Sequence, residues 1–283
     1  MSDLLITSPA NPRLKSLAAL RRRRGREETR TTLVEGHEEL ALALDCGIRP
    51  ATLFVCPELF SPGGPAGLQV IGLQEDVVTR ARTLGAEVVR LGRQAFEKVA
   101  YREGADGLLA VVPAVDPTLL ALDARGIAEL SARPLLLVSQ GVEKPGNLGA
   151  MLRTADAAGV AAVVAADPVT DWGNPNVVRA SKGTVFSVPV ASATTSETLA
   201  WLGRHGIPLV VTTPETDLLY TDVDLSGRVA VVVGAEKHGV DQQVLEAAAY
   251  RVRIPMLGRA NSLNVAASAA IVVYEAVRQR TRA

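Results

Sequence analysis

The second half of the chain carries four continuous apolar runs, rich in β-branched residues and separated by segments of helical periodicity. The runs cover residues 135–141, 160–167, 207–213 and 228–236. Parallel strands that are buried on both faces have this continuous apolar pattern, rather than an alternating one. The helical segments between the runs cover residues 148–159, 195–206 and 240–249. We therefore predict an α/β domain with a parallel sheet over residues 135–283.

The first hundred residues also alternate between strand and helix patterns, in shorter elements. The predicted strands cover residues 51–59, 86–92 and 107–112, and the predicted helices cover 37–47 and 74–85. These elements indicate a small α/β domain over residues 1–112. The next stretch, 113–134, contains three prolines and no clean strand. We place a linker there, because prolines interrupt regular elements.

A polar cluster opens the last helical segment, which is otherwise apolar from Val265 onward. The cluster contains Asn261, Ser262 and Asn264. One of these residues can cap the helix, because a side-chain oxygen accepts a hydrogen bond from a free N–H of the first turn. The other two need another explanation. The cluster follows a predicted strand at 250–256, and ligands of open parallel sheets bind beyond the carboxyl ends of the strands.

Two further strand ends carry polar residues. A glycine-rich loop at 141–146 leads into a helix that has Asn147 at its start and Arg153 six residues later. This loop is not a P-loop, because Asn147 and Leu148 stand where Lys and Ser or Thr are needed, and it lacks the Rossmann glycine spacing. Glu236 ends the apolar run that closes at the same edge of the sheet. Taken alone, Arg153 is more often a surface arginine than a residue of a site.

The composition permits a large core and excludes global disorder. Of the 283 residues, 48% are hydrophobic and 21% are charged. The start of the chain lacks the pattern of a secretory leader, and no apolar run is long enough to cross a bilayer. Cys46 and Cys56 have neither metal-ligand nor redox spacing, so we expect two buried thiols in a reducing compartment. These features predict a soluble, cytoplasmic protein without a metal site.

The charge distribution is more informative than the net charge, which is zero. Eight basic residues lie between Arg13 and Arg30, four of them consecutive from Arg21 to Arg24, against the two acidic residues Glu27 and Glu28. Such a run is either a solvated helix face or a footprint for the phosphates of a nucleic acid. The sequence alone leaves both interpretations open.

Three segments resemble the signature motifs of the TrmH/SpoU branch of the SPOUT RNA methyltransferases, in the same order and at similar distances. They are PGNLGAMLRTADAAGV (145–160), VVVGAEKHGV (231–240) and IPMLGRANSLNVAASAAIVVYEA (254–276). The intervening NPNVVRASKGTVFSVPV (174–190) agrees as well, so the resemblance covers roughly residues 135–280. The stretch at 21–44 resembles the L30e/L7Ae-like substrate domain that many of these enzymes carry.

This resemblance implies a fold and a cofactor. Members of the family thread the C-terminal segment through a loop as a deep trefoil knot, a rare exception to the rule that chains do not thread. S-adenosylmethionine binds in the knot, mainly to main-chain groups. The cofactor contacts that the resemblance assigns to this chain are Thr212, Gly234, Ile254, Met256 and Leu263.

The resemblance also implies a reaction. Arg153 matches the arginine that is held to activate the ribose 2′-hydroxyl, with Asn147, Glu236, Ser262 and Asn264 supporting it. An arginine is an unusual base, so Arg153 acts either in proton transfer or as a clamp on a phosphate. The implied protein is a homodimeric RNA 2′-O-methyltransferase whose N-terminal domain grips RNA. We favour 23S rRNA, where antibiotic-resistance methylases also act, over tRNA; a non-catalytic RNA-binding protein is the remaining alternative.

Overall fold

The computed structural model describes residues 4–60, 64–101, 104–126 and 132–281. Contacts divide the chain into two compact units: Met1–Val115 with Gly173–Ser187, and Asp116–Trp172 with Val188–Ala283. The domains predicted from the sequence, 1–112 and 135–283, differ from these units chiefly at residues 173–187. As functional domains they remain a prediction.

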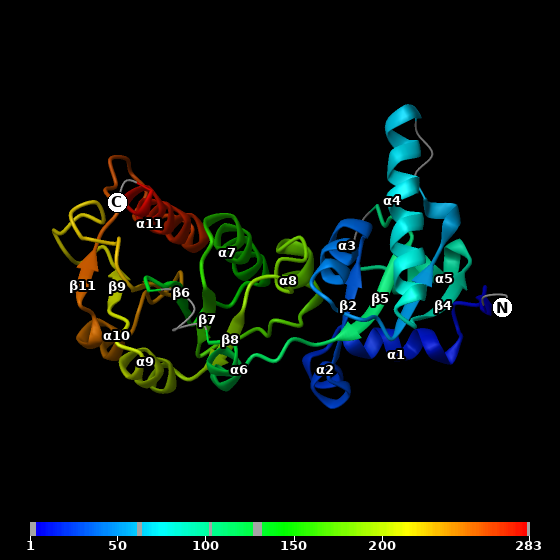
Figure 1. Ribbon diagram of the computed structural model, residues 1–283, viewed down its shortest axis with the longest axis horizontal. Helices are drawn as coiled ribbons and strands as arrows, with labels where there is room; N and C mark the ends of the chain where they lie inside the picture. The colour runs from blue at the N-terminus through cyan, green and yellow to red at the C-terminus, as the bar shows by residue number, and fades with distance from the viewer. Residues whose placement is uncertain (1–3, 61–63, 102–103, 127–131, 282–283) are drawn as a thin grey trace. The chain divides into compact units, whose positions relative to one another are not determined.

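The first unit is an α/β domain built on a five-stranded sheet (Figure 1). The strands lie in the order β1-β4-β3-β5-β2; β5 is antiparallel to both neighbours, and the other pairs are parallel. The strands are β1 (Leu4–Ile6), β2 (Thr31–Glu35), β3 (Thr52–Val55), β4 (Glu87–Leu91) and β5 (Leu108–Pro113). The helices are α1 (Pro12–Leu20), α2 (Arg23–Thr29), α3 (His37–Asp45), α4 (Gly64–Thr83), α5 (Arg93–Val99) and α8 (Pro175–Ala180), with the 3-10 helix η1 (Pro57–Leu59). The small N-terminal α/β domain expected from the sequence is confirmed.

The elements that the sequence pattern missed in this unit are β1, β2, α1, α2, α5 and α8. Their polar residues explain why. Thr32 and Glu35 of β2 and Arg26 of α2 are buried, although their types usually lie at the surface. Tyr101 holds the buried Glu35: its N–H donates to Oε2 at 2.8 Å, and its hydroxyl accepts from the Glu35 N–H at 3.0 Å. Burial, followed by the Glu35 charge, raises the pKa of Tyr101.

The segment Gly173–Ser187 leaves the connection between two strands of the second unit and packs in the first unit. The hydroxyl of Thr32 donates to the Gly173 carbonyl. Lys182 Nζ lies 3.0 Å from Glu38 Oε2 and 3.8 Å from Glu39 Oε1. The chain therefore passes between the units three times, and this segment completes the first unit.

The second unit contains a six-stranded sheet in the order β11-β9-β10-β6-β7-β8, with every neighbouring pair parallel. The strands are β6 (Leu135–Gln140), β7 (Ala162–Ala166), β8 (Val190–Ala193), β9 (Leu209–Thr212), β10 (Val229–Val233) and β11 (Tyr250–Val252). The helices are α6 (Leu119–Ala124), α7 (Pro145–Ala158), α9 (Thr195–Arg204), α10 (Gln242–Ala247) and α11 (Val265–Arg280). The parallel α/β sheet predicted from the apolar runs is confirmed.

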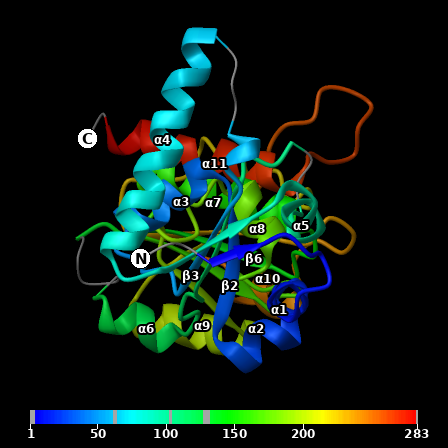
Figure 2. The ribbon, with the colours of Figure 1, turned by 90° about the vertical axis from the view of Figure 1, so that its right-hand side faces the viewer.

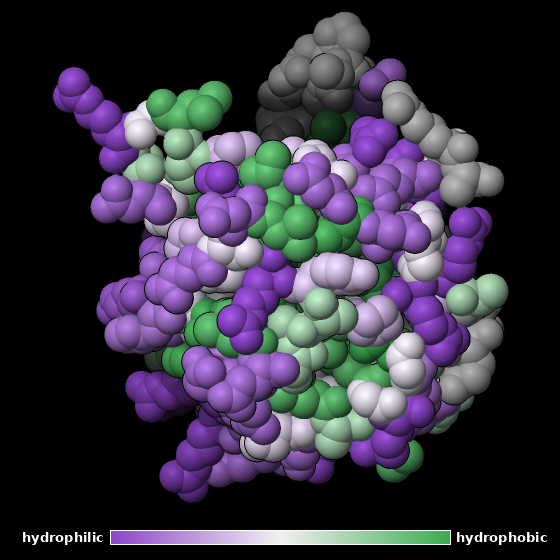
Figure 3. Space-filling model, turned by 90° about the vertical axis from the view of Figure 1, so that its left-hand side faces the viewer, coloured by the Kyte–Doolittle hydropathy of each residue, from purple (hydrophilic) through white to green (hydrophobic). Residues whose placement is uncertain are grey.

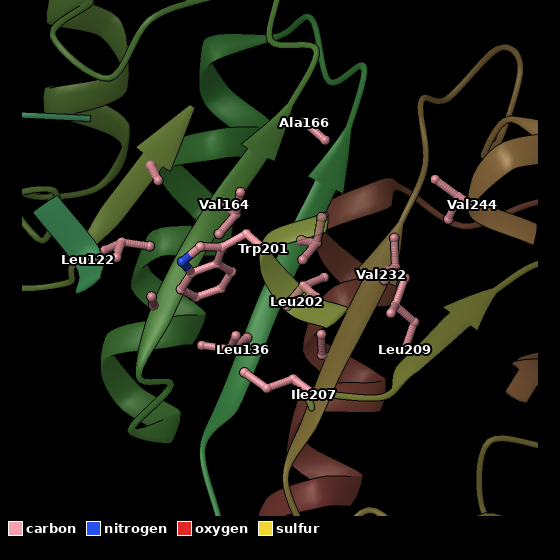
Figure 4. Close-up of a cluster of buried hydrophobic side chains, with 14 of the residues drawn as sticks. Leu122, Leu136, Val164, Ala166, Trp201, Leu202, Ile207, Leu209, Val232 and Val244 are labelled. Atoms are coloured by element: carbon pink, nitrogen blue, oxygen red, sulfur yellow. The ribbon is translucent and has the colours of Figure 1, made fainter. Parts of the chain in front are cut away.

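Helices cover both faces of this sheet, which explains why its strands are continuously apolar. Helices α7 and α11 lie on one face, and α6, α9 and α10 lie on the other (Figures 1 and 2). On the second face, Trp201 of α9 packs over Leu136, Val164 and Val232, which belong to three adjacent strands (Figure 4). Each of these four side chains is 0% exposed, so solvent does not reach the core here.

Asp123 ties the predicted linker to the second unit. Its Oδ1 accepts from Trp201 Nε1 at 2.6 Å and lies 2.9 Å from His205 Nε2. Part of the 113–134 stretch therefore forms helix α6, with Leu122 buried in the core beside Trp201. This short helix was not predicted, because the prolines on both sides of it indicated a linker.

The cysteines differ from the expected pair of buried thiols. Cys56 is buried, and burial together with the nearby Glu58 charge raises the pKa of its thiol. Cys46 is exposed. It caps the carboxyl end of α3, where the chain turns toward solvent at Gly47. The prediction was therefore wrong for Cys46. Within the described residues, no helix is both long and apolar enough to cross a membrane.

Candidate functional site

A cavity of about 370 Å³ opens at the carboxyl ends of β9 and β10 and beside the segment that leads into α11. This position is the one at which ligands bind to open parallel sheets. All five residues predicted to contact a cofactor line it: Thr212, Gly234, Ile254, Met256 and Leu263. The structure thus brings together residues from three separate stretches of sequence.

The loop after β10 forms a tight hairpin along this cavity. The N–H of Ala235 donates to the Gly239 carbonyl at 2.9 Å, and the N–H of Gly239 donates back to the Ala235 carbonyl at 2.9 Å. A Cβ atom on Gly234 would lie 2.2 Å from the carbonyl carbon of Gly239. Glycine at position 234 is therefore required by close packing of the hairpin on itself.

Three polar residues, Asn147, Glu236 and Asn264, meet beside the hairpin. Asn147 Nδ2 donates to Glu236 Oε1 at 2.7 Å. Asn264 Nδ2 donates to Asn147 Oδ1 at 3.1 Å and lies 3.4 Å from Glu236 Oε1. Lys144 Nζ forms an ion pair with the other carboxylate oxygen of Glu236. The hydrogen bonds from Lys144 and then Asn147 lower the pKa of Glu236, so the carboxylate is charged at neutral pH.

Asn264 also answers the question raised by the polar cluster before the last helix. Its Oδ1 accepts from the N–H groups of Ala266 at 3.0 Å and Ala267 at 3.3 Å, so Asn264 is the N-cap of α11. Because the oxygen faces these N–H groups, the amide nitrogen must face Asn147. The Asn264 side chain therefore caps α11 and also holds Asn147 of the first motif in place.

Arg153 and Ser262 take different positions. Ser262 lines the cavity. Arg153 is an exposed residue on α7 that does not line the cavity, and within the described part of the chain it forms no hydrogen bond or ion pair. The structure therefore joins Asn147, Glu236 and Asn264, and leaves the guanidinium of Arg153 available to a ligand.

A polar network under the hairpin was not foreseen from the sequence. Gln140, at the end of β6, donates through Nε2 to Thr195 Oγ1 at 2.7 Å and to Asp241 Oδ2 at 2.5 Å, and its Oε1 accepts from the Asp241 N–H at 2.9 Å. Thr195 in turn donates to Asp167 Oδ2 at 2.5 Å. The signal was available, because Gln140 is a polar residue that ends an apolar strand, at the edge where ligands bind.

The basic run in the first unit consists of residues with different partners. Arg21 donates to the carbonyls of Val99 at 2.6 Å and Ala100 at 2.9 Å, and the buried Arg26 donates to the Leu20 carbonyl at 2.9 Å. Ion pairs engage three more arginines: Arg13 with Glu87, Arg23 with Glu27 and Arg24 with Glu28. Within the described residues, the side chains of Lys15, Arg22 and Arg30 form no hydrogen bond or ion pair. Part of the run is therefore structural, and these three residues are its free charges.

The comparisons with known proteins agree with this arrangement. Residues 134–274 match the SpoU rRNA Methylase family, and residues 11–110 match the MRM3-like substrate binding domain. The 23S rRNA (guanosine(2553)-2'-O)-methyltransferase RlmP of Bacillus subtilis (strain 168) is 30% identical over 269 residues, which cover 95% of this chain and 97% of the relative.

Two solved structures cover nearly the whole chain. A crystal structure of an RNA 2'-O ribose methyltransferase is 38% identical, with a TM-score of 0.79, and covers 98% of this chain and 100% of the solved one. An AdoMet-bound rRNA methyltransferase from Sinorhizobium meliloti is 28% identical, with a TM-score of 0.81, and covers 97% of each chain.

The parallel sheet, the cavity at its carboxyl edge and these likenesses define an RNA methyltransferase. The chain belongs to the SpoU rRNA methylase family, as the three motifs had indicated. Within the described residues, no group of three or more His, Cys, Asp and Glu side chains is placed to hold a metal ion.

Proposed function

We propose that the protein transfers a methyl group from S-adenosylmethionine to a ribose 2′-hydroxyl of 23S rRNA. The observation that carries this proposal is the meeting of Asn147, Glu236 and Asn264, one from each motif, beside the cavity at the sheet edge. The substrate follows from the relatives, among which RlmP and several proteins named RlmB are 23S rRNA guanosine 2'-O-methyltransferases.

The cavity fits S-adenosylmethionine in size and chemistry. Its volume of about 370 Å³ lies within the range of small-molecule sites. The hairpin from Gly234 to Gly239 lines the cavity, and the absence of a side chain at Gly234 allows it to pack closely on itself there. Ile254, Met256 and Leu263 offer apolar surface to a purine ring. When bound, this cofactor supplies a methyl group on a positively charged sulfur that a nucleophile can attack.

The chain's own residues supply positioning and charge. In our proposal, Arg153 binds a phosphate of the RNA and stabilises the negative charge that develops on the 2′-oxygen. Arginine stays protonated in proteins, so the clamp is a better role for it than that of a base. The hydroxyl proton leaves to water as the 2′-oxygen accepts the methyl group. Asn147 and Asn264 position the ribose with Ser262, and Glu236 fixes both asparagines.

The remaining features of the proposal concern assembly. We propose that α11 is the threaded segment of a trefoil knot and that the second unit forms a homodimer. Apolar side chains gather on the exposed face of this unit in Figure 3, and its exposed large apolar residues include Tyr250, Leu257 and Tyr274. The loop before α11, orange in Figure 2, projects from its unit and carries Leu257, which is 99% exposed. Such surface is typical of a protein interface. The cytoplasm, where rRNA is modified, is the proposed location.

Ribose-methylation mapping of total RNA, with and without the gene, tests the proposal. The expected result is the loss of a 2′-O-methyl group from 23S rRNA in the deletion strain and its return with the wild-type gene. Loss of a methyl group from tRNA instead would contradict the proposed substrate. Calorimetry that detects no binding of S-adenosylmethionine to the pure protein would contradict the proposed reaction.

A further inference from the structure

A second cavity, of about 310 Å³, lies in the first unit between α1 and the face of the sheet. Leu17 and Leu20 of α1 and Phe54 of β3 close its apolar floor and are 2%, 6% and 3% exposed. Val111, in the middle of β5, also lines it and is only partly buried, although strands flank it on both sides. Helix α1 therefore leaves part of the sheet face uncovered, and the gap lies at the lower end of the size range of ligand sites.

Hydroxyl groups surround the apolar floor. Thr29 donates to the Gly25 carbonyl at 2.8 Å, so the 2.8 Å contact between Thr29 and Thr31 has Thr31 as its donor. Ser16 donates to the Arg13 carbonyl at 2.7 Å. The oxygens of Ser16 and Thr31 therefore keep lone pairs that can accept from a ligand. Thr52 forms no side-chain hydrogen bond with any described residue. A flat apolar ring that carries an amino group matches this combination.

Arg13 and Glu87, the charged residues among those that line the cavity, neutralise each other, so the additional positive charge comes from Arg30, next to the lining in sequence. Arg30 lies between the lining residues Thr29 and Thr31, is exposed, and has no ion-pair partner within the described part of the chain. Its backbone is left-handed, with φ of 54°, which makes α2 end there before β2 begins. Arg13, at the same cavity, is neutralised by Glu87 at 2.6 Å. Arg30 is thus the charge that is free to bind an anion next to the apolar gap.

We propose that this cavity binds one unpaired nucleotide of the RNA substrate, with its base against Val111 and the hydroxyl groups of Thr31 and Thr52, and its phosphate on Arg30. Proteins recognise single-stranded RNA by taking up splayed bases on apolar surfaces and reading their edges with polar groups. The accepting hydroxyls favour bases with an amino group, such as adenine, over uracil. The inference rests on the proposed function, since it requires an RNA substrate.

Filling the cavity tests this assignment. In the full-length protein, Ser16→Phe fills it from α1 and Val111→Phe fills it from the sheet, while Leu73→Phe changes an exposed residue outside it as a control. Binding of a fluorescent octa-adenylate is measured by anisotropy. We expect both filling variants to bind at least about 10-fold more weakly and the control to bind like wild type. We also expect octa-uridylate and a fully paired RNA duplex to bind wild type more weakly than octa-adenylate.

The charge is tested separately. Arg30→Asn removes the cation and keeps a residue that tolerates a left-handed backbone, whereas Arg24→Gln changes an arginine paired with Glu28. The slope of log K against log salt for octa-adenylate should fall by about 0.7 for Arg30→Asn, as for one lost phosphate contact, and stay unchanged for Arg24→Gln. Unchanged octa-adenylate affinity in both filling variants overturns the assignment. Calorimetry with S-adenosylmethionine on the same proteins separates the outcomes: if the cofactor binds normally, only the cavity assignment fails.

Discussion

Asn147 Nδ2 donates to Glu236 Oε1 at 2.7 Å, which joins the first turn of α7 to the hairpin after β10 across 89 positions of sequence. Because Asn264 donates to the same asparagine while it caps α11, the start of one helix fixes the start of another. The two asparagines and the carboxylate are therefore one unit. Changes in any of them are expected to affect the others non-additively.

Glu236→Gln is expected to weaken cofactor binding and catalysis. The amide keeps one acceptor for Asn147 and places an N–H₂ group toward the Lys144 ammonium, which has only donors. We expect a decrease of about 10-fold in kcat/KM for S-adenosylmethionine, on the scale of one lost charge-assisted hydrogen bond. Steady-state kinetics with varied cofactor measure it. Glu246→Gln is the control. Glu246 accepts an exposed hydrogen bond from Gln242, so this variant should behave as wild type.

The same carboxylate predicts a pH dependence. The fold lowers the pKa of Glu236, so the charged form is favoured above the ordinary glutamate pKa, and this preference is lost as the pH falls through the lowered value. Lys144→Met removes the largest cause of the shift. The acidic limb of kcat/KM should therefore move toward higher pH in Lys144→Met. An acidic limb at the wild-type pH would show that Lys144 does not set the charge of Glu236.

Gly234→Ala is expected to abolish detectable cofactor binding while leaving the unit folded. Its Cβ would lie 2.2 Å from the Gly239 carbonyl carbon, so the hairpin must open at the wall of the cavity. Calorimetry with S-adenosylmethionine measures the loss. Gly203→Ala is the matched control, because nothing lies within 4 Å of a Cβ there and α9 continues through it. The control should bind normally and gain up to about 1 kcal/mol in stability.

Gln140→Ala tests whether the buried network supports the hairpin. Without the amide, the Asp241 N–H and the Thr195 hydroxyl lose partners. Because Gln140 and Thr195 are buried and the hydrogen bond to the Asp241 N–H is partly buried, unfolding should require about 1–3 kcal/mol less free energy. Urea denaturation measures this value. Gln243→Ala removes an exposed hydrogen bond to Ser196 and should cost less than about 0.5 kcal/mol. Equal losses in the two variants would show that the buried position of Gln140 confers no special role.

The second sheet could be predicted well from the sequence because its central strands β6, β7 and β10 are buried along their whole length. Runs such as LLLVSQ in β6 have no other stable environment, and β9, β10 and β11 form where they were expected. The prediction from sequence failed where charged residues are buried and where a segment packs in the other unit. The buried charged residues Arg26 and Glu35 interrupt the apolar pattern of α2 and β2, so these elements were not predicted. Residues 173–187 belong to the first unit, although they follow β7 of the second unit in sequence.

The site shows the same division. Strand ends and motifs led to Asn147, Glu236 and Asn264, which do meet. No local pattern indicates that Arg21 binds the carbonyls of Val99 and Ala100, because that contact exists only after α1 and α5 pack together. The sequence therefore shows how many basic residues the run contains. Which of them are free to bind a ligand depends on their partners in the folded protein.

Arg153→Ala tests the proposed mechanism most directly. The guanidinium is exposed, lies outside the cofactor cavity, and has no partner among the described residues, so its removal should leave folding and cofactor affinity nearly intact. Methyl transfer should fall by about 10²-fold or more, the scale for deleting a group that stabilises developing charge. Arg153→Lys should restore little, because an ammonium cannot reproduce the planar fork that holds a phosphate. Single-turnover methyl transfer beside cofactor titration separates the two effects, with Arg204→Ala on α9 as an exposed-arginine control. If Arg153→Ala retains near wild-type single-turnover rates, Arg153 is a surface residue and the catalytic assignment must move to the side chains that line the cavity.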